Sequence, residues 1–325
     1  MPTKTARPPP YKHDISHKFQ LADSHNLGGH GCFNAGVFIV KRISTGENAV
    51  QKRYKTEDIR NGTAEFEMRV MQKYSHDNIV EYLCGFVDET THHEPVASVF
   101  MEYCDEGNVN DVLKEHFKLD QPMAENKVWH IATGLVNAVA FLQYGVRDAC
   151  FNPEPPKPNW TGVLHRDIKP DNIFLCSQPG ELLPRVVLGD FGQGYLVNDD
   201  GKWGRQYMFG NTSTAPPEVN AGGLCAYTFA GDVYAVGATI RIICEDTTQA
   251  GLAGFPFGSY YSDVLTVAIS DLTRAEQFQR PRMDIFGSLM PELQHSALSR
   301  GSHHRFGPSY RDFDQRQHQR HRRRW

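Results

Sequence analysis

Three polar side chains of complementary chemistry lie within one six-residue stretch: Asp167, Lys169 and Asn172. Asp167 offers a carboxylate that can accept a proton, and Lys169 offers a cation that can neutralise phosphate charge. Asn172 offers a carbonyl oxygen that can hold a metal ion. Pro170 stiffens the loop, because its ring fixes φ and removes one donor. Together these groups suit a reaction that orients a hydroxyl, neutralises phosphate and holds a metal.

This polar loop lies between apolar residues 163–164 and apolar residues 173–175, which predicts that both of its ends are buried. The sequence His-Arg-Asp at 165–167, followed by Lys169 and Asn172, resembles the catalytic loop of eukaryotic protein kinases. The alternative is an ordinary charged turn, and the rest of the chain decides between the two.

Residues 28–37 are rich in glycine, and Gly29 and Gly31 allow backbone amides to approach phosphates closely. The segment resembles the kinase glycine-rich loop, with two departures. The third glycine position falls on Asn34, and the valine position falls on Gly36 or, with a one-residue insertion, on Val37. Taken alone, this segment is explained equally well by a plain strand–turn–strand.

Lys52 lies 23 residues beyond Gly29, the separation that a two-stranded hairpin requires. Strand alternation over 49–54 puts Val50 on the same face as Lys52. Lys52 resembles the strand lysine that holds the α and β phosphates of ATP, although many strand lysines are only solvated charges. Val50 stands where the family usually has an alanine that packs over adenine. The larger side chain predicts less space above the adenine ring, that is, a tighter roof.

A helix is predicted over 63–75, because Glu67 falls on the same face as apolar positions 70, 71 and 74. A glutamate on a buried stripe needs a partner, since burying an unpaired carboxylate is costly. Lys52 is the natural partner, as in the kinase lysine–glutamate pair. Glu65 is the competitor, but it points away from that stripe.

Residues 99–104 form a predicted strand that runs into a breaker cluster at 105–108. This resembles the hinge between kinase lobes, in which backbone groups of Glu102 and Cys104 would bind adenine. Met101 takes the gatekeeper position, and Asn108 stands where many kinases place a ribose-contacting acid. Phe174, just after the catalytic loop, completes the expected nucleotide site.

An apolar strand at 185–189 ends in Asp-Phe-Gly at 190–192, 23 residues after Asp167. The resemblance implies that Asp190 binds a Mg²⁺ ion bridging the nucleotide phosphates and that Asn172 binds a second. Oxygen ligands of this kind suit a hard cation.

The next loop ends in Pro-Pro-Glu at 216–218, in the place of the kinase Ala-Pro-Glu. The threonine that usually touches the catalytic residues falls on Asn211, unless a gap brings Thr212 into place. Candidate phosphorylation sites, which imply an upstream activating kinase, are Tyr195, Tyr207, Thr212, Ser213 and Thr214. Arg166 is of the kind that pairs with such a phosphate. The resemblance also assigns Asp232 to support of the catalytic loop and Arg280 to a pair with Glu218.

The resemblance predicts a two-lobed α+β kinase domain over residues 19–298, with an N-lobe at 19–103 and a C-lobe at 104–298. A proline-rich insertion is expected at about 147–160, where four prolines in six positions forbid helix. Residues 1–18 are expected to be a flexible leader, and residues 299–325 a basic disordered tail.

Charge is distributed unevenly along the 325 residues, whose net charge is −4. The tail holds eight of the 34 Lys and Arg and two of the 38 acidic residues, so the remainder carries about −10. The Arg-rich end at 320–324 is of a kind that binds nucleic acid or an acidic surface, although most basic ends have no such role. Seven cysteines without Cys-x-x-Cys spacing predict reduced thiols in an intracellular protein, in the cytoplasm or nucleus. We see no secretory signal and no apolar run long enough to span a bilayer, so no membrane partner is expected.

The function implied is ATP- and Mg²⁺-dependent phosphoryl transfer to serine or threonine hydroxyls of protein substrates. Lys169 decides the acceptor class, because tyrosine kinases place an arginine pattern in that loop. One alternative is a pseudokinase that keeps the fold as a binding module, favoured by the departures at Asn34 and Asn211. Another is a small-molecule phosphotransferase, which tends to lack Lys169 and the Pro-Pro-Glu segment. The hinge and compact domain resemble the NIMA-related group of kinases.

Overall fold

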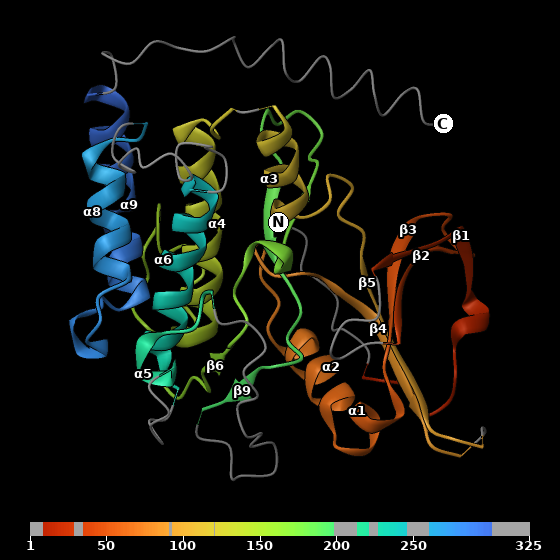
Figure 1. Cartoon of the computed structure of the whole chain (residues 1–325). Helices are drawn as coiled ribbons and strands as arrows, with labels where there is room; N and C mark the ends of the chain where they lie inside the picture. Colours follow the sequence, from red (N-terminus) through yellow and green to blue (C-terminus); the bar gives the residue numbers. More distant parts are fainter. Residues whose placement is uncertain are drawn as a thin grey trace.

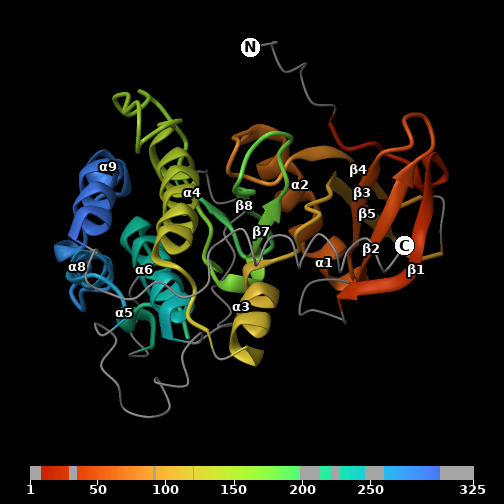
Figure 2. The same ribbon diagram turned by 90° about the horizontal axis from the view of Figure 1, so that it is seen from above.

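The computed structural model describes residues 9–28, 35–90, 93–119, 121–197, 213–220, 227–245 and 260–300. A β-rich small lobe and a mainly helical large lobe lie side by side (Figures 1 and 2). This is the α+β, two-lobed arrangement predicted from the sequence.

The small lobe is a five-stranded antiparallel sheet in the order β1-β2-β3-β5-β4. Its strands are β1 Phe19–Gly28, β2 Gly36–Arg42, β3 Asn48–Arg53, β4 Tyr82–Asp88 and β5 Val96–Glu102. Two helices, α1 Thr56–Arg60 and α2 Thr63–Lys73, follow β3. The predicted stripe of α2 is buried, because Val70, Met71 and Tyr74 all pack in the core. Glu67 lies on that stripe, so α2 carries a carboxylate into the interior.

The large lobe is built around the long helix α4 Glu125–Tyr144, which contacts α9, α6 and β8. The other helices are α3 Val109–Lys118, α5 Pro217–Asn220, α6 Phe229–Glu245, α8 Asp263–Leu272 and α9 Met283–Arg300. Short 3₁₀ turns are η1 Ser16–Lys18, η2 Pro170–Asn172 and η4 Gln277–Gln279.

Two small two-stranded antiparallel sheets lie in the large lobe. Strand β6 Val163–Leu164 pairs with β9 Tyr195–Leu196, and β7 Ile173–Cys176 pairs with β8 Arg185–Leu188. The polar loop at 165–169 leaves β6 and enters η2 and β7, so it is fixed at both ends, as the apolar flanks predicted.

The expected flexible leader is wrong for residues 11–18. The Tyr11 amide donates to the Gly85 carbonyl at 2.8 Å, and the Val87 amide donates to the Tyr11 carbonyl at 3.0 Å. Ile15 is buried in a small cluster with Phe86 and the β5 residue Phe100. The polar composition of this segment hid one apolar anchor, which is enough to dock it on the sheet. Residues 1–8 lie outside the described part.

The proline-rich insertion is exposed along most of its length but anchored at its end. Trp160 donates from Nε1 to the Leu142 carbonyl at 3.1 Å, and its ring meets Tyr74 edge-on at 5.4 Å. The Tyr74 hydroxyl donates to the Thr161 carbonyl at 2.6 Å. The insertion therefore contacts the end of α2, a contact that its proline content did not predict.

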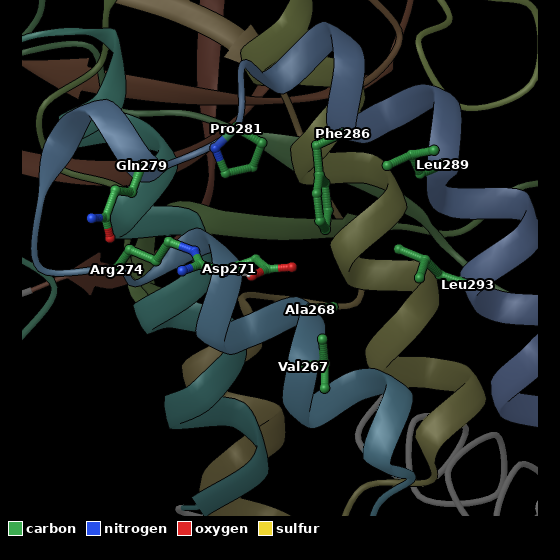
Figure 3. Close-up of a pocket in the computed structure, with 9 residues that line it drawn as sticks. All are labelled: Val267, Ala268, Asp271, Arg274, Gln279, Pro281, Phe286, Leu289 and Leu293. Atoms are coloured by element: carbon green, nitrogen blue, oxygen red, sulfur yellow. Dashed lines mark hydrogen bonds and ion pairs between the residues drawn. The ribbon is translucent and has the colours of Figure 1, made fainter.

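The end of the large lobe differs slightly from the predicted boundary, because α9 continues to Arg300, two residues past 298. A pocket of about 500 Å³ lies between α8 and α9, lined by Phe286, Leu289 and Leu293 with Asp271 and Arg274 among its polar residues (Figure 3). None of the site residues expected from the sequence lines it. Among the described helices, none is long and apolar enough to cross a membrane.

Candidate active site

Lys52 stands at the centre of a charge cluster that joins the two lobes. Its ammonium donates to both Glu67 carboxylate oxygens at 2.9 Å and to Asp190 Oδ1 at 2.8 Å. Burial lowers the pKa of Lys52, but the carboxylates of Asp190 and Glu67 outweigh it, so the pKa is raised and the side chain stays charged. Helix α2 is thereby connected through β3 to the Asp-Phe-Gly segment. Glu67, not Glu65, is the partner of Lys52.

Tyr54 is a member of this cluster that the sequence analysis missed. Its hydroxyl donates to Glu67 Oε2 at 3.0 Å, and the ring is buried. The signal was present, because strand alternation places position 54 on the same side as positions 50 and 52. The second hydrogen bond helps to fix the carboxylate that receives Lys52.

Asp167 lies in a compact hydrogen-bond network on the loop that follows β6. Lys169 Nζ is 2.7 Å from Asp167 Oδ2 and 3.0 Å from Oδ1, and Asn172 Nδ2 donates to Oδ2 at 2.9 Å. Burial raises the pKa of Asp167, although Lys169 opposes the rise. The sequence predicted that these three residues act together, and the structure brings their side chains into contact.

The loop that carries Asp167 is held from below by Asp232 on α6. Asp232 accepts hydrogen bonds from the backbone amides of His165 at 2.8 Å and Arg166 at 2.9 Å. Arg166 adopts a φ of 69°, a left-handed backbone conformation that residues other than glycine rarely adopt. The support therefore maintains a strained backbone directly before the candidate base.

Asp190 also has a positive φ, 64°, at the turn after β8. Burial acts to raise its pKa, but the Lys52 ammonium lowers it to about 2, so the carboxylate is ionised at neutral pH. Asn172 donates its amide nitrogen to the Asp167 backbone carbonyl at 2.8 Å as well as to the carboxylate, which leaves its side-chain oxygen as a ligand. An ionised carboxylate and an amide oxygen are the donors that Mg²⁺ prefers, so these residues fit the ion.

The segment after β5 presents the backbone expected of an adenine-binding hinge. The Glu102 amide donates to the Glu81 carbonyl at 3.0 Å, and the Cys104 carbonyl accepts from the Gly107 amide at 3.3 Å. These two hydrogen bonds use the Glu102 amide and the Cys104 carbonyl, not the Glu102 carbonyl and the Cys104 amide. The Glu102 side chain points elsewhere, into an ion pair with Arg185. Asn108 caps α3, because its Oδ1 accepts from the Asp111 amide at 2.9 Å.

Three of the other residues expected to contact the nucleotide lie in the described part of the chain. Val37 lies opposite Lys52 in the β2–β3 register, Val50 lies opposite the gatekeeper Met101, and Phe174 forms a bridge with Asn108. Gly29, Gly31, Asn34, Tyr207, Asn211 and Thr212 lie outside the described residues.

Comparison with known proteins places this arrangement in a family. Residues 24–253 match the family model described as "Protein kinase domain", which is more than half of the chain. The chain belongs to the protein kinase family.

Several relatives of this kinase are NIMA-related. It is 29% identical over 222 residues to the G2-specific protein kinase fin1 of Schizosaccharomyces pombe, covering 66% of this chain and 29% of the relative. It is 30% identical over 240 residues to the G2-specific protein kinase nimA of Emericella nidulans, covering 66% and 31%. It is 25% identical over 233 residues to the serine/threonine-protein kinase Nek2 of Homo sapiens, covering 67% and 47%. The matches thus span from less than a third to about half of these relatives' length, and the NIMA-related resemblance is confirmed.

The kinase has the expected ion pair between Arg280 and Glu218, at the end of the activation segment, which runs from the Asp-Phe-Gly at 190–192 to the Pro-Pro-Glu at 216–218. Arg280 donates from both terminal nitrogens to the two Glu218 oxygens at 2.7 Å, and the Arg280 side chain is fully buried. A bidentate pair of this kind fixes geometry as well as charge. Of the candidate phosphorylation sites, Thr214 is buried, Ser213 is exposed, and Tyr195 lies on β9 with its ring 5.9 Å from the Arg166 guanidinium.

One sequence-based expectation about cysteines is wrong. Cys104 and Cys176 form a disulfide in the structure, although all seven cysteines were expected to be reduced. Sequence spacing could not reveal this pairing, because the two residues are 72 positions apart. The hinge and β7 bring them together.

Proposed function

We propose that this chain is a catalytically active serine/threonine kinase that transfers the γ-phosphoryl group of ATP, with Mg²⁺, to hydroxyls of protein substrates. The observation that carries the proposal is the unbroken contact from Glu67 through Lys52 to Asp190, beside the Asp167 network. A binding module that only kept the fold would not need all of these groups in one place.

Lys52 and Glu67 position the nucleotide phosphates, and the Glu102 carbonyl and Cys104 amide hydrogen-bond adenine. Val37 and Val50 cover the base from above, and Phe174 lies below it. Gly29 and Gly31 bring backbone amides to the phosphates, and Asn108 offers its amide nitrogen to the ribose. These contacts position the reacting phosphorus, which is the main task in phosphoryl transfer.

Asp190 and Asn172 hold Mg²⁺ through oxygen atoms. When bound, the metal neutralises charge on the phosphate oxygens. The low pKa of Asp190 keeps its carboxylate available as a ligand across the physiological range.

Asp167 orients the acceptor hydroxyl and takes its proton, and Lys169 steadies the transferring phosphoryl group. The Lys169 ammonium lies 2.7 Å from Asp167 Oδ2, which supports a role for this cation beside the base. The relatives named above support serine and threonine as the acceptors. An upstream kinase that phosphorylates the activation segment is an expected partner.

The competing function is a pseudokinase, for which the departures at Asn34 and Asn211 are the supporting observation. The two are separated by radiolabelled phosphate transfer from MgATP to serine, threonine and tyrosine peptides, comparing wild type with Asp167→Asn. We expect transfer to serine and threonine peptides that the variant loses, with MgADP binding retained. Nucleotide binding without transfer, even after the activation segment is phosphorylated, would favour the pseudokinase.

A further inference from the structure

Two cysteines from distant parts of the chain meet beside the hinge. Cys104 belongs to the hinge, and Cys176 is the last residue of β7. Their Cα atoms are 4.3 Å apart, and the residues are 9% and 6% exposed. The structure joins their sulfur atoms in a disulfide.

The backbone on either side of the two cysteines holds them together independently of the sulfur–sulfur bond. The Glu106 amide donates to the Leu175 carbonyl at 3.1 Å, and the Leu175 amide donates to the Gly107 carbonyl at 2.9 Å. The Ser177 amide donates to Asp105 Oδ1 at 2.8 Å. Residues 105–107 therefore run alongside β7, so the two thiols remain neighbours when they are reduced.

We propose that Cys104 and Cys176 are an oxidation site of this kinase, cross-linked reversibly by a small peroxide, and that the cross-link tightens nucleotide binding by holding the hinge against β7. The cross-link itself needs no assumption about function. The effect on nucleotide binding rests on the proposed function.

A peroxide such as H₂O₂ supplies the oxidising equivalents. The Cys104 thiolate, the more exposed of the two, attacks one peroxide oxygen, which breaks the O–O bond and leaves a sulfenic acid and hydroxide. The Cys176 thiolate then attacks the sulfenic sulfur, forms the S–S bond and expels the second oxygen as hydroxide. The two hydroxides take the two thiol protons, so two thiols and one peroxide become one disulfide and two waters. Both side chains are nearly buried, which favours a small oxidant over glutathione disulfide.

The cross-link joins two of the segments that adenine is proposed to contact, the hinge and the strand that carries Phe174. The Cys104 amide is the hinge donor, and Phe174 precedes Cys176 by two residues, on the same face of β7. A bond between positions 104 and 176 removes relative motion of hinge and strand before the nucleotide arrives. Binding then costs less ordering, so the oxidised protein should bind more tightly.

A metal site is the competing use of these residues. Glu102, Cys104 and Cys176 offer ligand atoms within 4.8 Å of one another, and they are the one such group among the described residues. The Glu102 carboxylate, however, is already paired with the Arg185 guanidinium. A cation in that position disfavours a second cation, so we prefer the thiol pair.

The test uses the full chain, first reduced and then treated with increasing H₂O₂. Peptide mapping by mass spectrometry locates the cross-link, and calorimetry measures the Kd of MgADP in each state. Cys176→Ser removes the cross-link. Cys84→Ser is the matched control, because Cys84 is also 6% exposed but is a free cysteine on β4, outside the Cys104–Cys176 pair.

We expect a Cys104–Cys176 cross-link in wild type and in Cys84→Ser, a Kd for MgADP lower by about threefold or more, and full reversal by dithiothreitol. Cys176→Ser should form no such cross-link, and peroxide should leave its Kd unchanged. Reversal in wild type keeps the test decisive if Cys176→Ser does not fold.

Three results would overturn the proposal: no cross-link between these residues, a complete cross-link with an unchanged or higher Kd, or thiols that bind Zn²⁺ tightly and resist peroxide. If MgADP binds neither state, the proposed function fails, and with it the effect on nucleotide binding. The mass-spectrometric result then decides separately whether the oxidation site exists.

Discussion

Lys52 and Glu67 are joined by two hydrogen bonds of 2.9 Å, in surroundings where only 1% of the Glu67 side chain is exposed. At this depth either charge would be costly to bury alone, so each side chain depends on its partner. Because Lys52 lies on β3 and Glu67 on α2, the contact ties the helix to the sheet.

Replacing Lys52 with methionine should both abolish transfer and destabilise the fold. Glu67 would lose its cation while remaining buried, which costs about 3 kcal/mol in the free energy of unfolding. Urea denaturation measures that loss. The double variant Lys52→Met/Glu67→Leu should regain part of the stability but no activity.

Lys114→Met is the matched control for that loss. Lys114 pairs with Asp111 at 2.9 Å on an exposed helix face, so its removal should cost less than about 1 kcal/mol. Equal losses in the free energy of unfolding at positions 52 and 114 would show that the buried pair stabilises the fold no more than the exposed pair does.

Activity should fall on the acid side of neutrality, because Asp167 must be ionised to accept a proton. Burial raises the pKa of Asp167 above its ordinary value of 3.8, so the acid limb of the kcat profile should lie above that pH. Activity is then present above the raised pKa and lost as the pH falls through it.

Lys169 opposes that rise, which gives the pH profile an internal test. Lys169→Met should lower kcat and also move the acid limb to higher pH, because the cation that favours the carboxylate is gone. A limb that stays in place, measured with a serine peptide at saturating MgATP, would assign the ionisation to another group.

Trp160 should stabilise the kinase through the end of α2. Trp160→Ala removes the ring contact with Tyr74 and the hydrogen bond to Leu142, at a cost of about 2 kcal/mol for a half-buried tryptophan. We expect a lower Tm and a lower kcat, since α2 carries Glu67. Phe151→Ala is the control, because Phe151 lies in the same insertion but is 64% exposed. Equal Tm values for both variants would rule out the anchor.

Val50 should restrict the space above adenine. Val50→Ala removes two methyl groups from the roof opposite Met101, so bulky adenine-site inhibitors should bind the variant more tightly. Inhibition constants for one small and one bulky inhibitor measure the change. Unaltered sensitivity to the bulky compound would contradict the tighter roof.

The side-chain contacts of the candidate active site could be predicted because each residue lies in a short local motif whose spacing is fixed by the elements around it. Asp167, Lys169 and Asn172 fall on one loop, and their contacts follow from that loop alone. Glu67 needed a further physical step, namely that a carboxylate on a buried helix face requires a cation. That step led to Lys52.

The missed features depend on contacts between segments that carry no shared motif. Cys104 meets Cys176 only because the hinge runs beside β7, and Trp160 meets Tyr74 only because the insertion folds back onto α2. Ile15 was missed for a simpler reason, since one apolar residue in a polar segment gives no periodic signal. Tertiary contact, not local pattern, decides all three.

The docking of Tyr11 on β4 has a consequence for how this kinase can be shortened. Strand β4 ends the sheet order, and the backbone of Tyr11 takes up an amide and a carbonyl on that outer side. A protein beginning at residue 19 would expose these groups, and an open strand edge is a template for pairing with another molecule. Dimers or aggregates of such a shortened protein would then reflect the cut and not a natural assembly.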